Sequence, residues 1–130
     1  MPFNFKTNCE SYQFLNESFS LFLFDDSGNT RLGLAINIKD KPKAVTALTD
    51  KEKTMTEDLS FLFFDSAPQK PTSAIFKTFN GSNYAIRYLN YDPQNTGSLS
   101  LDYAFIGDKL VIATSKNTMM QLVNKFVSSY

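Results

Sequence analysis

The stretch LSLDYAFIGDKLVIATSKNTMMQLVNKFV, residues 99–127, decides the fold of this chain. Every second residue of its first part is apolar: Leu99, Leu101, Tyr103 and Phe105. This alternation predicts a half-buried strand, and Gly107-Asp108 predicts a tight turn into a second strand over residues 110–114. Ser115 is a good helix N-cap. The apolar residues after it have helical spacing: Met119, Leu122, Val123, Phe126 and Val127.

Four more strands and one more helix are predicted on the N-terminal side of this stretch. Strand-like segments at 19–24 and 31–38 flank a turn that contains Gly28, and those at 74–79 and 84–91 flank the hairpin signal Asn80-Gly81. In the second segment, Leu32, Leu34, Ile36 and Ile38 face one way, and Arg31, Gly33, Ala35 and Asn37 face the other. Asp40 and Pro42 predict the start of a helix that we expect to extend from residue 41 to residue 63.

The resulting order is β-β-α-β-β-β-β-α, an α+β fold with an antiparallel sheet of about six strands. Short connections between consecutive strands imply antiparallel pairing. We expect both helices to pack on one face of the sheet, so that the other face meets solvent or a partner. Residues on that other face are predicted to be Lys77, Arg87, Ser100, Asp102 and small side chains. Residues 1–17 are expected to form an arm or short helix, and residues 18–130 a single domain.

The composition argues against several kinds of partner and cofactor. The chain has 130 residues, with 13 Lys and Arg balanced by 13 Asp and Glu, and its basic residues are scattered. Because nucleic-acid binders usually carry a basic face, we expect no nucleic-acid partner. No run approaches the ~20 apolar residues of a spanning helix, so no membrane insertion by this segment is expected. With no His and one Cys, no zinc site with nitrogen or sulfur ligands is expected, and no cofactor motif is present.

No catalytic residues are predicted. Nucleophilic catalysis of the Ser–His or Cys–His type needs a base that this chain lacks. Two carboxylates could support glycoside hydrolysis, but Glu57 and Asp58 are adjacent and would point about 100° apart on a helix. Asp102 is expected to form a cross-strand ion pair with Arg87. We therefore expect that the protein is not an enzyme, and keep a hydrolase that uses carboxylates alone as the third hypothesis.

The candidate binding residues are Arg87, Tyr88, Tyr91 and Asp102. Tyrosine is enriched at interfaces because its side chain is large, stiff and amphipathic. Tyr84 and Tyr88 share one face of their strand, and Tyr91 falls on the opposite face. The alternative interpretation is that these rings line the sheet beneath the helices.

Three segments, in this order, resemble a family of uncharacterised bacterial proteins from candidate-phylum genomes. They are MTEDLSFLF (55–63), AIRYLN (85–90) and SLDYAFIGDKLVIATSKNT (100–118). Those proteins look like membrane-anchored chains with an extracytoplasmic α+β domain, and the resemblance covers about residues 55–126. It implies a cell-envelope location, and it supplies no activity and no catalytic residues.

Two functions are therefore expected ahead of the hydrolase. The first is a non-enzymatic interaction or structural domain of the bacterial cell envelope, with a protein partner or self-association. The alternative is a small-molecule or lipid-binding domain with an apolar pocket between the sheet and the C-terminal helix, because Phe and Met suit such a pocket.

Overall fold

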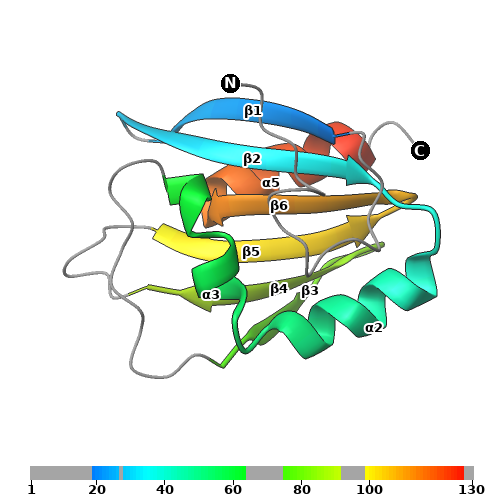
Figure 1. The fold of residues 1–130 in the computed structure, drawn as a ribbon. Helices are drawn as coiled ribbons and strands as arrows, with labels where there is room; N and C mark the ends of the chain where they lie inside the picture. Colours follow the sequence, from blue (N-terminus) through cyan, green and yellow to red (C-terminus); the bar gives the residue numbers. More distant parts are fainter. Residues whose placement is uncertain (1–18, 27, 64–74, 92–98, 128–130) are drawn as a thin grey trace.

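Six antiparallel strands form one sheet (Figure 1) in a computed structural model that describes residues 19–26, 28–63, 75–91 and 99–127. The strands are β1 (Phe19–Asp26), β2 (Asn29–Asn37), β3 (Lys77–Asn80), β4 (Ala85–Asn90), β5 (Leu99–Ile106) and β6 (Lys109–Ser115). Their order across the sheet is β1-β2-β6-β5-β4-β3, with every neighbouring pair antiparallel. The predicted α+β class and the predicted order of strands and helices are confirmed. The predicted arm over residues 1–17 lies outside the described residues.

The predicted helix over residues 41–63 is divided into three shorter elements: α2 (Lys41–Lys51), α3 (Met55–Asp58) and the 3₁₀ helix η2 (Ser60–Phe63). Asp40 caps α2 as predicted, because its Oδ1 accepts a hydrogen bond from the amide of Lys43 at 3.1 Å. The α2 helix ends in a turn in which the amide of Thr54 donates to the carbonyl of Lys51 at 3.0 Å. This turn redirects the chain, so that Glu52 faces the sheet rather than solvent.

The C-terminal helix α5 (Lys116–Val127) begins where the sequence predicts it. The hydroxyl of Ser115 accepts a hydrogen bond from the amide of Thr118 at 3.2 Å, which is the bond expected of an N-cap. No helix in the described part of the chain is long and apolar enough to cross a membrane.

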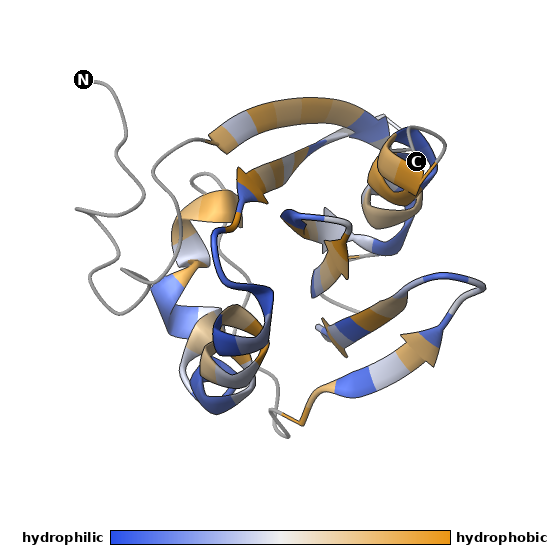
Figure 2. Ribbon diagram, turned by 90° about the vertical axis from the view of Figure 1, so that its right-hand side faces the viewer, coloured by the Kyte–Doolittle hydropathy of each residue, from blue (hydrophilic) through white to orange (hydrophobic). Residues whose placement is uncertain are grey.

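The helices lie on opposite faces of the sheet, which corrects the prediction that both pack on one face. We call the two faces the α2 face and the α5 face. The α2, α3 and η2 helices cover a core that includes Leu34, Leu101 and Ile112, whereas α5 covers a separate core that includes Val111 and Ala113. Figure 2 shows the sheet between these two layers, seen from the side. The central strands β5 and β6 are therefore buried on both faces.

Small residues explain why α5 packs on the face that the sequence pattern assigned to solvent. Gly33, Ala35, Ala104 and Ala113 all lie on this face. Without large side chains between them, the helix and the sheet backbone can come close together. A Cβ atom at Gly33 would lie 2.6 Å from Cδ1 of Leu122, a fully buried residue of α5. A stripe of small residues was therefore a helix-docking surface and not a polar exterior.

Gly33→Ala is expected to destabilise the protein by about 1–3 kcal/mol, because the added methyl group overpacks the contact with Leu122. Chemical denaturation of the parent and the variant would measure this difference. In a Leu122→Ala background the cost of Gly33→Ala should fall to less than about 0.5 kcal/mol, since the clash is then removed. An equal cost in both backgrounds would show that Gly33 is required for another reason.

Helix α5 covers only part of the α5 face of the sheet. Its main contacts are with β6, β5, β2 and β1, so β4 and β3 extend beyond it. On this part of the sheet, Phe79 and Ile75 are exposed, and Tyr88 is half-buried. The α5 face therefore has an open side at the β3–β4 edge.

Candidate functional site

The four predicted binding residues are divided between the two faces of the sheet. In the register of β4 and β5, Arg87 lies opposite Tyr103, and Tyr88 lies opposite Asp102. Because successive side chains in a strand point to opposite faces, Arg87 belongs to the α2 face and Asp102 to the α5 face. The predicted ion pair between Arg87 and Asp102 is therefore wrong.

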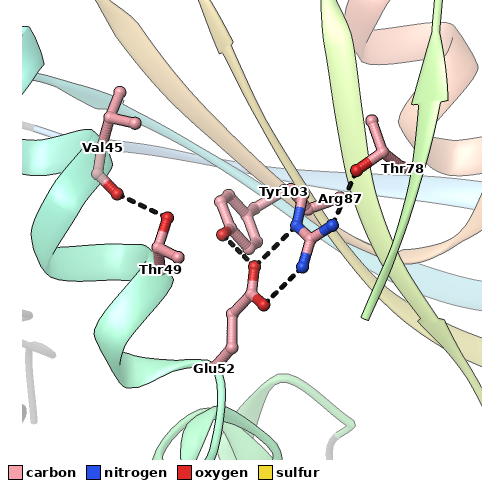
Figure 3. A network of polar contacts seen from close by, with 6 residues as sticks. All are labelled: Val45, Thr49, Glu52, Thr78, Arg87 and Tyr103. Carbon is pink, nitrogen blue, oxygen red and sulfur yellow. Dashed lines mark hydrogen bonds and ion pairs between the residues drawn. The ribbon is translucent and has the colours of Figure 1, made fainter. Parts of the chain in front are cut away.

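Arg87 instead pairs with Glu52, at the C-terminal end of α2 (Figure 3). The guanidinium donates from Nε to Oε2 of Glu52 at 2.8 Å and from Nη2 to Oε1 at 2.6 Å. Its Nη1 donates to the hydroxyl of Thr78 at 2.6 Å, and the hydroxyl of Tyr103 donates to Glu52 Oε2. This network joins α2 to β3, β4 and β5.

The physical setting of this network indicates a structural role. The hydrogen bonds from Arg87 to Glu52 raise the pKa of the guanidinium, so that its charge is fixed at every working pH. Burial, together with the bond to Glu52, raises the pKa of Tyr103. The sequence carried a signal for this network, because Glu52 is a charged residue on the apolar stripe between Leu48 and Met55.

Tyr91 lies in the core of the α2 face. Its ring packs edge to face against Phe63, with centroids 5.2 Å apart, and burial raises its pKa to about 12. The position of Tyr91 therefore matches the second interpretation of the tyrosines, in which the ring lines the sheet beneath a helix.

The other two predicted residues, Tyr88 and Asp102, meet in a cavity on the α5 face. The cavity has a volume of about 170 Å³ and lies between β3, β4 and β5 and the first turns of α5. Its lining residues are Phe79, Ile86, Tyr88, Asn90, Asp102, Lys116, Met119 and Met120. The open side of the α5 face and this cavity are thus the same region.

The cavity has an apolar end and a polar end. Along β4 the lining residues are Ile86, Tyr88 and Asn90, so polarity increases in one direction along a single strand. Phe79 lies opposite Ile86 at the apolar end. Lys116 belongs to the first turn of α5, near the polar end.

Asp102 is the unusual group in this cavity, because its residue is only 3% exposed and its Oδ1 has no hydrogen-bond partner among the described residues. The hydroxyl of Ser100, also buried, has none either. Burial raises the pKa of Asp102 from 3.8 to about 7, and the nearby Ser100 hydroxyl and Lys116 ammonium lower it only in part. No ion pair joins Lys116 to Asp102 in the described part of the chain.

The backbone of β5 is irregular beside these two groups. The pairing of β5 with β6 shifts by one residue between Leu99 and Asp102. Such bulges re-aim side chains and are common next to functional sites. A one-residue shift cannot be read from an alternating pattern, so the sequence did not reveal that Ser100 and Asp102 are both buried.

A second hollow of about 290 Å³ adjoins the first, because Tyr88 and Asn90 line both. Its other lining residues are Ile75, Lys77 and Leu89. Both hollows lie toward the β3–β4 edge, away from the Glu52–Arg87 network. Within the described residues, no group of three or more Cys, Asp or Glu side chains could hold a metal ion.

Comparison with protein-family models, with curated proteins and with solved structures found no match. The candidate site is therefore defined by its own geometry.

Proposed function

We propose that this protein is a small-molecule-binding domain whose site is the cavity between β4, β5 and the start of α5. The observation that carries the proposal is the carboxyl group of Asp102, which is buried in the cavity wall and whose Oδ1 has no hydrogen-bond partner among the described residues. Buried polar groups are nearly always hydrogen-bonded, and an unsatisfied one requires an explanation. A ligand that bonds to Asp102 when it enters the cavity supplies that explanation.

The dimensions of the cavity support a small ligand rather than a lipid. An engineered apolar cavity of about 150 Å³ in another protein accommodates benzene. The cavity here measures about 170 Å³, so it suits a ligand of roughly five to eight non-hydrogen atoms. A lipid chain would require the second hollow as well.

The lining residues favour binding over catalysis. Asp102 is the one carboxylate among the residues that line the cavity in the described part of the chain. Carboxylate-only hydrolysis of a glycoside requires two such groups, about 5–10 Å apart. The remaining polar side chains, from Tyr88, Asn90 and Lys116, can fix the orientation of a ligand.

The methionines allow a direct test of this proposal. Met119 and Met120 line the cavity, whereas Met55 is buried beneath the α2 face. In a protein labelled with ¹³C at the methionine methyl groups, a library of fragments with five to eight non-hydrogen atoms should contain members that shift the Met119 and Met120 signals. The Met55 signal should stay in place.

Two matched variants test whether the shift of the Met119 signal comes from a ligand in the cavity. Met120→Trp should abolish the shift of Met119, because the larger side chain occupies the cavity. Gln121→Trp, at an exposed position one residue further along α5 that does not line the cavity, should preserve it. If no fragment moves Met119 or Met120 at millimolar concentration, the proposed function is wrong.

A second candidate function is favoured by the β1 edge of the sheet. This strand is paired on one side only among the described strands, and Leu21 and Leu23 on it are 52% and 66% exposed. An edge strand with free backbone groups is a template for another strand. The candidate is an interaction domain that self-associates by antiparallel pairing of β1, in the cell envelope that the resemblance implies. Signals that change with protein concentration at β1, rather than with fragments at Met119, would favour it.

A further inference from the structure

The chemistry of the cavity also indicates the charge of its ligand. We propose that the cavity binds a small organic cation, a primary ammonium with a short apolar chain, and that the ammonium group pairs with Asp102. This inference rests on the proposed function and adds the chemical class of the ligand.

The first argument is the state of Asp102 itself. Asp102 lines the cavity and is almost fully buried, and its Oδ1 accepts no hydrogen bond from any described residue. An ionised carboxylate in such a place is costly unless it is paired. An ammonium group supplies both the opposite charge and up to three N–H donors.

The second argument compares a cation with a neutral ligand. A hydrogen bond between charged partners is about twice as strong as one between neutral groups. Lys116 also lines the cavity, but its side chain is exposed and forms no ion pair with Asp102. Its charge is therefore screened by water, and the position next to the carboxylate is left to the ligand.

The third argument concerns the rest of the ligand. Asp102 lies opposite Tyr88, and Ile86 is two residues away along β4, about 7 Å toward the apolar end. Between them the walls are the Tyr88 ring and the thioethers of Met119 and Met120. A chain of about four carbons attached to the ammonium fits this distance, and aromatic and sulfur groups suit both the chain and the adjacent charge.

Proton binding competes with the ligand. The titratable and charged groups around Asp102 are Tyr88 on β4, Lys116 on α5 and, beyond Tyr88, Lys77 on β3. The carboxyl of Asp102, with its pKa raised to about 7 by burial, changes its charge around neutral pH.

The test uses n-butylammonium, with n-butanol and n-butyrate as probes of equal chain length, and follows the Met119 and Met120 methyl signals during titration. We expect n-butylammonium to bind with a Kd on the order of 1 mM at pH 8.5. Binding should be roughly 30-fold weaker at pH 5.5, because the carboxylate is about one-thirtieth ionised there. Butanol should bind at least tenfold more weakly at pH 8.5, and butyrate should not bind.

Asp102→Asn is expected to lower the affinity for n-butylammonium at least tenfold and to remove its pH dependence. Asp50→Asn, which removes an exposed carboxylate from α2, should change neither. Equal binding of butanol and butylammonium, or stronger binding of butyrate, would overturn this inference while leaving the proposed cavity function intact. A cavity that binds none of these probes and no fragment would remove both.

Discussion

We expect the stability of Asp102→Asn relative to the parent to be higher at pH 8 than at pH 4. The difference in the free energy of unfolding between variant and parent should increase by about 2–4 kcal/mol between these two pH values. The reason is the burial of this carboxyl group, which raises its pKa from 3.8 to about 7 in the native protein. A difference of about three pH units between native and unfolded pKa corresponds to about 4 kcal/mol. We take this figure as the upper limit, because local relaxation and water entry reduce the effect of burial.

The sign follows from proton binding in the two states. Between pH 4 and pH 7 the native carboxyl keeps its proton while the unfolded one has lost it, so stability falls as pH rises. Below pH 4 both states are neutral, and above pH 7 the full cost is present. Asparagine titrates in neither state, so the variant lacks this loss.

Urea denaturation of both proteins at pH 4, 6 and 8 measures the effect. Other carboxylates contribute equally to parent and variant, and the fixed cost of burying an amide cancels between the two pH values. Asp50→Asn serves as the matched control, since this exposed side chain should show no pH-dependent difference. A constant difference between parent and Asp102→Asn across the range would mean that Asp102 is ionised in the native protein down to pH 4.

Glu52→Ala is expected to destabilise the protein by about 3 kcal/mol. It removes the partner of both Arg87 and the buried hydroxyl of Tyr103. An unsatisfied buried group costs about 1–3 kcal/mol, and more if it is charged. The Arg87 side chain is 33% exposed and that of Glu52 is 12% exposed, so water recovers part of the charge pair and limits the total.

A double-mutant cycle separates the contacts in this network. We expect coupling of about 1–2 kcal/mol between Glu52→Ala and Arg87→Met. Arg87→Lys should not restore the parent stability, because a lysine cannot make the two parallel hydrogen bonds to Glu52. Asp50→Ala, nearby on α2, is the control and should change stability by less than about 0.5 kcal/mol. Coupling near zero would show that the network forms without stabilising the fold.

These two predictions distinguish a polar network that stabilises the fold from a buried carboxyl group that costs stability when it ionises. In the Glu52–Arg87 network each charged group has a partner of opposite charge, so removing one of them should lower the free energy of unfolding. Asp102 is the opposite case, because its ionisation should cost stability as pH rises, and Asp102→Asn should remove that pH-dependent cost. Groups with strongly perturbed pKa values cluster at functional sites, so Asp102 supports the binding site that we propose.

The sequence determined the six strands, the C-terminal helix and the order of strands and helices, although the predicted helix over residues 41–63 is three shorter elements. Alternation over residues 99–105, the cap at Ser115 and the spacing of apolar residues after it are local signals, and each produced the predicted element. Local signals suffice here because strand and helix periods are set by backbone geometry within a few residues. The separation of Tyr88 from Tyr91 onto different faces followed from the same rule.

The tertiary structure alone decided which face each helix covers and which charged groups meet. From the sequence, small residues such as Gly33 were predicted to face solvent, whereas in the structure helix α5 packs against them. The partner of Arg87 depended on the strand register, which places Tyr103 rather than Asp102 opposite Arg87, and on the end of α2 at Lys51, which turns Glu52 toward the sheet. The burial of Asp102 in a cavity wall depended on the β5 bulge and on the extent to which α5 covers the sheet. Contacts between residues distant in sequence are determined by packing and strand register, so a local sequence pattern cannot predict them.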